Sequence, residues 1–371
     1  FESIANDISD LVLEYGGALS GEHGDGLVRS PFMRKMFGPT LYDAFRTIKQ
    51  TFDPNGILNP GKIVDAPPLT ANLRFGPRYA TRTPQTYFDY ADYRGMAGAV
   101  EMCSGLGACR KTLDGTMCPS YMATREEQHS TRGRANVLRL TMAGRLGESG
   151  LGDRGVYETL DLCLECRACK SECPVGVDVA RFKSEFLADY WKRHGTSLEA
   201  RLLGHARLVA RWGSRLAPAS NWLANSGPVR RMNERLFGID RRRRLPRFER
   251  RTLQQRVKGR DSRGGHQVHD ALLFTDTFTN HYDPEIGIAA MDVLAAAGFR
   301  ATLAPNLCCG RPQISKGLLS SARDLAAANA EGLYDAAAAG RPLVFCEPSC
   351  LSAIREDAPA LLRGEARRKA E

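Results

Sequence analysis

The sequence of 371 residues contains no apolar run of the roughly 18–20 residues that a membrane-spanning helix requires. It also lacks internal repeats, low-complexity tracts and any segment that resembles a secretion or transit signal. These absences exclude collagenous and largely disordered proteins and argue against an integral membrane protein. The length favours two or three domains.

No large excess of one charge is present either. Lysine and arginine number 52 and aspartate and glutamate 42, and much of the resulting charge of +10 lies in residues 241–251. A nucleic-acid-binding protein is expected to combine a basic face with exposed aromatic residues or a known binding module, and we find neither. We therefore expect no nucleic-acid partner.

Cysteine, in contrast, is abundant: there are eleven, an odd number. Clustered cysteines in a long chain without a signal peptide are typical of metal binding in a reducing compartment, and we expect a cytoplasmic protein. The chain begins at Phe1 and enters a helical pattern directly, so we also expect a fragment of a longer polypeptide.

The pattern of apolar, glycine and proline residues divides the chain into five segments. Amphipathic helices are predicted over residues 1–15 and 39–51, and the stretch 66–95, rich in Pro, Thr and Tyr, is interpreted as a linker. The expected segments are an N-terminal part (1–65), the linker (66–95), a cysteine-rich helical domain (96–200), a basic helical connector (201–265) and an α/β part (266–371).

Short apolar runs alternate with alanine-rich helical patterns in the last segment. Residues 271–274 and 342–345 read as buried parallel strands, and residues 286–297 and 320–338 as the helices that cover them.

The strongest motif is Cys163-x2-Cys166-x2-Cys169-x3-Cys173-Pro174. Three thiolates at this spacing can bind one cubane cluster, and the fourth ligates the other cluster in two-cluster ferredoxins. A zinc site normally draws two cysteine pairs from separate loops. We predict iron–sulfur ligation here, with a zinc knuckle or a set of free thiols as the alternative.

A second set, Cys103-x5-Cys109-x8-Cys118-Pro119, lies upstream. Aligned to the same template, Cys118 joins Cys163, Cys166 and Cys169 in one cluster. Cys103 and Cys109 join Cys173 in the other, and Leu106 occupies the position of its fourth ligand. Such a cluster is either [3Fe-4S] or a [4Fe-4S] whose last iron takes a ligand from elsewhere. The alternative is that Cys103 and Cys109 are buried structural thiols.

Four more cysteines follow: Cys308, Cys309, Cys346 and Cys350. Each lies at the end of a predicted strand, where α/β folds place their ligands. Adjacent thiolates such as Cys308 and Cys309 can ligate two metals or two edges of an unusual cluster. Buried small hydrophobic residues or a redox dithiol are the alternatives.

Three parts of the chain resemble known families. Residues 21–26 (GEHGDG) and 53–62 resemble the end of the FAD-linked oxidases, which include D-lactate, glycolate and D-2-hydroxyglutarate dehydrogenases. The two cysteine runs with residues 131–135 (TRGRA) resemble dicluster Fe–S proteins, and Cys308-Cys309-Gly310 resembles the cysteine-rich CCG domain. Together they resemble bacterial fusion dehydrogenases.

The resemblance to the FAD-linked oxidases implies roles for five residues. Glu22 corresponds to a ligand of a catalytic divalent metal (Zn or Mn), and His23 to the general base. Asn59 and Lys62 correspond to the segment near the flavin, although Lys62 is equally well explained as an exposed charge. Arg29 is a candidate for binding the substrate carboxylate, although a surface arginine is the simpler explanation.

The resemblance implies an α+β multidomain fold: the end of an FAD-linked oxidase, a mostly α-helical dicluster ferredoxin domain and the first half of an α/β CCG domain, with Cys308, Cys309 and Cys350 as candidate ligands of a further cluster. It implies FAD-dependent oxidation of a D-2-hydroxy acid to the 2-oxo acid: D-2-hydroxyglutarate first, then D-lactate or glycolate. Two Fe–S clusters would carry electrons to a quinone or another carrier. An upstream FAD domain and a second CCG half are the implied partners.

Two alternatives remain open. One is an electron-transfer protein similar to heterodisulfide reductase, without dehydrogenase chemistry of its own. The other is a zinc-stabilised scaffold. Residues 201–216, with leucines, Trp212 and several arginines, also allow at most a peripheral contact with the inner face of the membrane, although a helix packed on the ferredoxin domain is the simpler interpretation.

Overall fold

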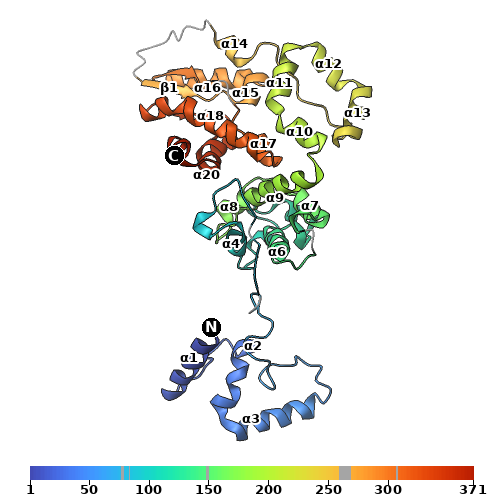
Figure 1. The fold of residues 1–371 in the computed structure, drawn as a ribbon, viewed down its shortest axis with the longest axis vertical. Helices are drawn as coiled ribbons and strands as arrows, with labels where there is room; N and C mark the ends of the chain where they lie inside the picture. Colours follow the sequence, from blue (N-terminus) through green and yellow to red (C-terminus); the bar gives the residue numbers. More distant parts are fainter. Residues whose placement is uncertain (77–78, 83, 148–149, 259–268, 306–307) are drawn as a thin grey trace. The chain divides into compact units, whose positions relative to one another are not determined.

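The computed structural model describes residues 1–76, 79–82, 84–147, 150–258, 269–305 and 308–371 (Figure 1). The chain forms two compact units, Phe1–Ala80 and Thr81–Glu371. Among the described residues, no helix has the length and apolar character needed to cross a membrane. The α+β multidomain class predicted from the sequence is confirmed, since helices dominate and the strands form one small sheet.

Three α-helices make up most of the first unit. Gly38 adopts a positive φ of 72° and interrupts the last helix, so that its second segment begins at Pro39, where proline favours a helix start. This segment corresponds to the predicted helix 39–51. The helices are α1 (Glu2–Glu14), α2 (Gly26–Arg29) and α3 (Met33–Phe52).

The apolar face predicted for the first helix is not buried within this unit. Ile4, Ile8 and Leu11 of α1 remain 62%, 55% and 54% exposed. The periodicity correctly indicated a helix, but burial of its face depends on what packs against it.

The second unit begins with a helical region that carries seven of the cysteines. Ser130, Asp153 and Asp178 each cap a helix here by accepting a hydrogen bond from a backbone N–H of its first turn. The helices are α4 (Met96–Glu101), α5 (Pro119–Thr124), α6 (Thr131–Met142), α7 (Arg154–Asp161), α8 (Ala168–Glu172) and α9 (Val179–His194).

The end of the stretch interpreted as a linker differs from that expectation. Phe88 is fully buried in the core of the second unit, together with Phe182 and Phe186 of α9. Its backbone N–H donates to the Glu185 carboxylate, 2.6 Å away. A stretch rich in turn-forming residues still contributes a large aromatic side chain to the core, because burying such a side chain is favourable wherever the backbone permits it.

The basic connector is helical and packs against the α/β part. Ser214 Oγ lies 3.0 Å from His281 Nδ1, and the Glu249 backbone N–H donates to the His281 carbonyl at 2.8 Å. The end of the predicted connector, residues 259–265, lies outside the described residues. The helices are α10 (Leu198–Gly204), α11 (Ala206–Arg215), α12 (Ala219–Asn225), α13 (Gly227–Phe237) and α14 (Leu253–Val257).

A parallel three-stranded sheet with the order β2-β1-β3 organises the last part of the chain. Strands β1 (His269–Leu273) and β3 (Leu343–Val344) correspond to the two predicted strands. Strand β2 (Phe299–Leu303) was not predicted, because this edge strand is only half buried and contains Arg300 and Thr302. The predicted covering helices correspond to α16 (Pro284–Ala296) and α18 (Leu319–Ala338).

Shorter helices complete this part: α15 (Thr277–His281), α17 (Arg311–Ser315), α19 (Pro348–Ser352), α20 (Ala358–Leu361) and α21 (Gly364–Ala370). A single π-helical turn, Ala353–Asp357, joins α19 to α20 and places the Asp357 carboxylate in the interior.

Candidate functional site

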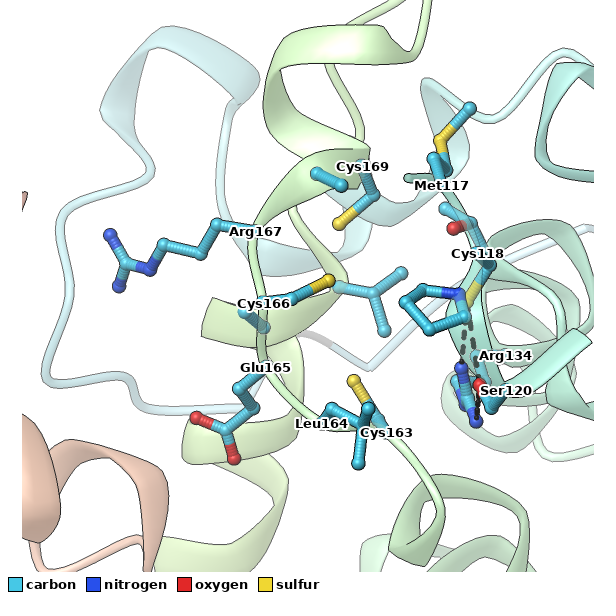
Figure 2. Close-up of a pocket in the computed structure, with 15 residues that line it drawn as sticks. Met117, Cys118, Ser120, Arg134, Cys163, Leu164, Glu165, Cys166, Arg167 and Cys169 are labelled. Atoms are coloured by element: carbon cyan, nitrogen blue, oxygen red, sulfur yellow. Dashed lines mark hydrogen bonds between the residues drawn. The ribbon is translucent and has the colours of Figure 1, made fainter. Parts of the chain in front are cut away.

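The segment between α7 and α8 directs three cysteine side chains to one side. Glu165 and Arg167, which alternate with the cysteines, have positive φ values of 52° and 63° and turn the backbone sharply twice within the motif. Cys163, Cys166 and Cys169 consequently line one pocket, and Figure 2 shows their sulfur atoms pointing toward its centre.

The fourth thiol of this pocket comes from a distant part of the chain. Cys118 precedes Pro119 at the start of α5 and faces the other three cysteines across the pocket (Figure 2). The structure therefore brings together the four cysteines that the ferredoxin template assigns to one cluster. We call this group the four-thiol pocket.

A buried guanidinium lies against the four-thiol pocket. Arg134 of α6 is fully buried and donates to Cys118 Sγ at 3.4 Å and to Ser120 Oγ at 2.9 Å (Figure 2). A third hydrogen bond reaches the Thr159 carbonyl at 3.2 Å. Among the described residues no carboxylate pairs with Arg134. A buried cation requires a compensating negative charge, and an iron–sulfur cluster with four thiolate ligands is anionic, so this surrounding fits such a cluster.

A second pocket gathers the remaining cysteines of the helical region. Cys103, Cys109 and Cys173 line it, and Leu106 stands in the same wall. The backbone N–H of Arg132 donates to Cys109 Sγ at 3.3 Å. We call this group the three-thiol pocket.

Burial affects the acidity of these thiols. It raises the pKa of Cys169 to about 12 and raises the pKa values of Cys163 and Cys109 as well. In the described part of the chain no three His, Cys, Asp or Glu side chains stand close enough together to hold a single metal ion.

The remaining cysteines form a third group beside the sheet. Cys308, Cys309 and Cys350 are buried, and the Cys309 thiol donates to Cys350 Sγ at 2.9 Å. A hydrogen bond with Cys309, together with burial, raises the pKa of Cys308. Cys346 is half buried.

A buried ion-pair network, which sequence reasoning missed, connects the third cysteine group to the four-thiol pocket. Arg311, directly after Cys308-Cys309-Gly310, donates to the Glu165 carbonyl at 2.7 Å and approaches the Asp357 carboxylate at 3.4 Å. Arg167 and Arg181 pair with the same carboxylate. No local pattern marks these residues, because they are brought together across as many as 190 positions of sequence.

The first unit places its candidate residues at the surface. Glu22 and His23 are 88% and 79% exposed in their side chains, and the His23 ring lies 3.2 Å from the Glu22 carboxylate. Arg29 donates to the Gly24 carbonyl at 2.8 Å, which closes the glycine-rich turn. Asn59 and Lys62 are exposed. The described residues of this unit do not gather the five into one pocket.

The turn that carries Asn59 is held by Asp53, a further residue that sequence reasoning did not single out. Its buried carboxylate accepts hydrogen bonds from the backbone N–H groups of Ile57 and Leu58 and from Lys49 Nζ, at 2.8, 2.9 and 2.5 Å. The bond from Lys49 makes the largest contribution to lowering the pKa of Asp53. Asn59 itself has a positive φ of 49°.

Comparison with known protein families matches two of these regions. Residues 1–63 match the C-terminal domain of FAD-linked oxidases, and residues 99–177 match the 4Fe-4S dicluster domain. The chain thus carries the end of an FAD-linked oxidase domain followed by a dicluster domain.

Relatives extend the similarity to nearly the whole chain. It is 28% identical to D-2-hydroxyglutarate dehydrogenase of Escherichia coli and 29% identical to that of Pseudomonas putida, over 96% and 95% of its length. It is 28% identical, over 45% of its length, to one of the subunits of the anaerobic glycerol-3-phosphate dehydrogenase of E. coli, of which it covers 42%. It spans 39% of the length of the two D-2-hydroxyglutarate dehydrogenases. No solved structure matches it.

Proposed function

We propose that this chain is part of a dehydrogenase that oxidises a D-2-hydroxy acid to the 2-oxo acid. D-2-hydroxyglutarate is the first candidate substrate, followed by D-lactate and glycolate. The observation that carries the proposal is the pair of thiol-lined pockets in a chain whose first 63 residues match FAD-linked oxidases. When bound, FAD supplies hydride acceptance, and iron–sulfur clusters supply one-electron transfer to a quinone or another carrier.

In this proposal the four-thiol pocket holds a [4Fe-4S] cluster through Cys118, Cys163, Cys166 and Cys169. The three-thiol pocket holds a [3Fe-4S] or [4Fe-4S] cluster through Cys103, Cys109 and Cys173. Cys308, Cys309 and Cys350 form a candidate site for a further cluster, because three buried sulfur donors lie together there.

The first unit would complete the dehydrogenase site. Neutral His23 accepts the proton of the substrate hydroxyl, and Glu22 contributes one ligand to a divalent Zn or Mn ion. Arg29 pairs with the substrate carboxylate, while Asn59 and Lys62 lie along the flavin. The exposure of these side chains supports this assignment, since it leaves them accessible to substrate and to other parts of the protein.

Anaerobic purification followed by iron and acid-labile sulfide analysis and low-temperature EPR tests the cluster assignment. We expect iron and sulfide in both pockets. Reduction of the clusters by D-2-hydroxyglutarate in the complete natural protein then tests the substrate. Clusters that dithionite reduces but no 2-hydroxy acid does would favour a pure electron-transfer protein. Iron-free, zinc-loaded protein would overturn the proposal.

Leu106→Cys is predicted to supply the missing ligand of the three-thiol pocket. Leu106 lines this pocket and is 70% exposed, so a cysteine fits there without steric conflict. If the cluster has three irons, the variant should gain one iron and lose the EPR signal of an oxidised [3Fe-4S] cluster. Leu113→Cys, at a 95% exposed position outside both pockets, is the control. An unchanged three-iron signal in Leu106→Cys would contradict the assignment.

Arg134→Gln is predicted to lower the reduction potential of the cluster in the four-thiol pocket. Reduction adds a negative charge, and the buried guanidinium stabilises that charge. At an effective dielectric constant of about 20 and a separation of roughly 6 Å, the interaction amounts to roughly 3 kcal/mol, or on the order of 100 mV. EPR-monitored redox titration measures this shift.

The matched control is Arg145→Gln, which removes the same charge from an exposed position just beyond α6. It should shift the potential far less, because solvent screens its charge. Equal shifts in both variants would show that burial of Arg134 against Cys118 has no special effect on the cluster.

A further inference from the structure

A cavity that none of the roles above uses lies where the connector meets the α/β part. It has a volume of about 400 Å³ and lies between α11 and α15, which pack against each other. Four of its ten lining residues are arginines, and the other six are uncharged serine, threonine, glutamine, asparagine and histidine side chains. The arginines are Arg207, Arg211, Arg215 and Arg250.

The positive charge of this cavity is not compensated by neighbouring carboxylates. Arg211, Arg215 and Arg250 form no ion pair within the described parts of the chain. The nearby carboxylates of Glu249 and Glu285 both pair with Arg256 instead, the former at 2.8 Å. Several guanidinium groups around one cavity repel each other, and a bound anion would relieve this repulsion.

The floor of the cavity is built from buried, neutral polar groups. Ser214, Asn280 and His281 are 3%, 1% and 5% exposed, and the His281 ring lies within hydrogen-bonding distance of the other two, at 3.0 and 3.2 Å. Burial, together with the charges of Arg207 and Arg211, lowers the pKa of His281 to about 4. The imidazole is therefore neutral at pH 7, and these hydrogen bonds fix the floor.

The spacing of the arginines indicates the size of the anion. Arg207, Arg211 and Arg215 follow each other at intervals of four residues along one face of α11. Eight residues of helix span about 12 Å, more than a single carboxylate occupies. Guanidinium groups bind phosphate oxygens in a bidentate manner, which adds strength and orientation.

We propose that this cavity binds a phosphate-bearing ligand with more than one negative charge. The phosphate belongs either to a free small molecule with a diphosphate group or to the headgroup of an anionic lipid. The lipid source is relevant because Leu208, Trp212 and Leu216, on the same helix, are 51%, 58% and 59% exposed. Either ligand is distinct from the hydroxy acid and the clusters.

Calorimetric titration of the full chain with inorganic diphosphate tests the free-ligand source. We expect saturable binding of one diphosphate per chain that weakens as ionic strength rises. The double variant Arg211→Gln/Arg250→Gln should bind at least about tenfold more weakly. The control Arg243→Gln/Arg244→Gln removes two equivalent charges from exposed positions that do not line the cavity, and it should bind within about twofold of the unaltered chain.

Sedimentation with vesicles tests the lipid source. If the cavity takes a headgroup, vesicles of phosphatidylglycerol and phosphatidylcholine should retain the unaltered chain, diphosphate should release it, and the cavity variant should stay in solution. Vesicles of phosphatidylcholine alone should retain none of them.

The proposal is overturned if neither diphosphate nor the anionic vesicles bind, or if the cavity variant and the control lose binding equally. The salt dependence measured on the unaltered chain keeps the test independent of how well the variants fold. Neither arm depends on iron, flavin or hydroxy acid, so its result is separate from that of the proposed dehydrogenase function.

Discussion

Replacing Cys118 with alanine is expected to remove the cluster of the four-thiol pocket while leaving the other cluster in place. Cys118 is separated from Cys163 by 45 positions, yet its side chain faces the same pocket. The variant should lose roughly half of the iron, because four of seven or eight irons would go. Cluster ligation also contributes to folding, so we expect the unfolding free energy to fall by several kcal/mol.

Iron analysis, EPR and urea denaturation of the anaerobically purified variant measure these effects. Cys346→Ala is the matched control, because this thiol is half buried and lines neither pocket. It should keep the iron content and spectra of both clusters. Full iron content in Cys118→Ala, or loss of the second cluster in place of the first, would show that the template assigns the cysteines wrongly.

Asp357→Asn is expected to cause the second large effect, a loss of about 3–5 kcal/mol of unfolding free energy. The Asp357 carboxylate is fully buried and pairs with Arg167, Arg181 and Arg311. Burial and the neighbouring Arg167 already lower the pKa of Arg311, which shows that cations are held close together here. Without the carboxylate these guanidinium groups remain buried with too little negative charge.

The adjacent Glu356→Gln provides the comparison. Glu356 is 39% exposed in its side chain and pairs with Lys170 at the surface, so we expect less than about 1 kcal/mol. Urea denaturation of both variants, followed by tryptophan fluorescence, measures the difference. Similar losses in the two variants would mean that the buried network does not stabilise the contact between the four-thiol pocket and the α/β part.

The Asp357 network also gives the variant a local effect. Arg167 lies between Cys166 and Cys169, and Arg311 directly follows the Cys308-Cys309-Gly310 segment. The same carboxylate therefore fixes the backbone at the four-thiol pocket and beside the third cysteine group. We expect Asp357→Asn to increase hydrogen exchange in both segments, whereas a general loss of packing would increase it most in the least buried elements.

Local spacing was sufficient for much of what the sequence indicated. Cys163, Cys166 and Cys169 share a pocket because they lie within seven residues, where the backbone alone can direct three side chains to one side. The helix at 39–51 and the two predicted strands follow equally local rules of proline placement and apolar runs. The half-buried edge strand β2 escaped prediction because its polar residues hide that pattern.

Only the tertiary structure decided which charges are buried and what they meet. The sequence identifies Arg134, Asp357 and Arg250 as charged residues, but not that the first is buried against Cys118, the second is shared by three arginines and the third lines a cavity. Glu22 and His23 show the converse, since the motif names them while the described residues of the first unit supply no surrounding pocket. Burial and pairing depend on contacts between distant segments, and such contacts leave no periodic trace in the sequence.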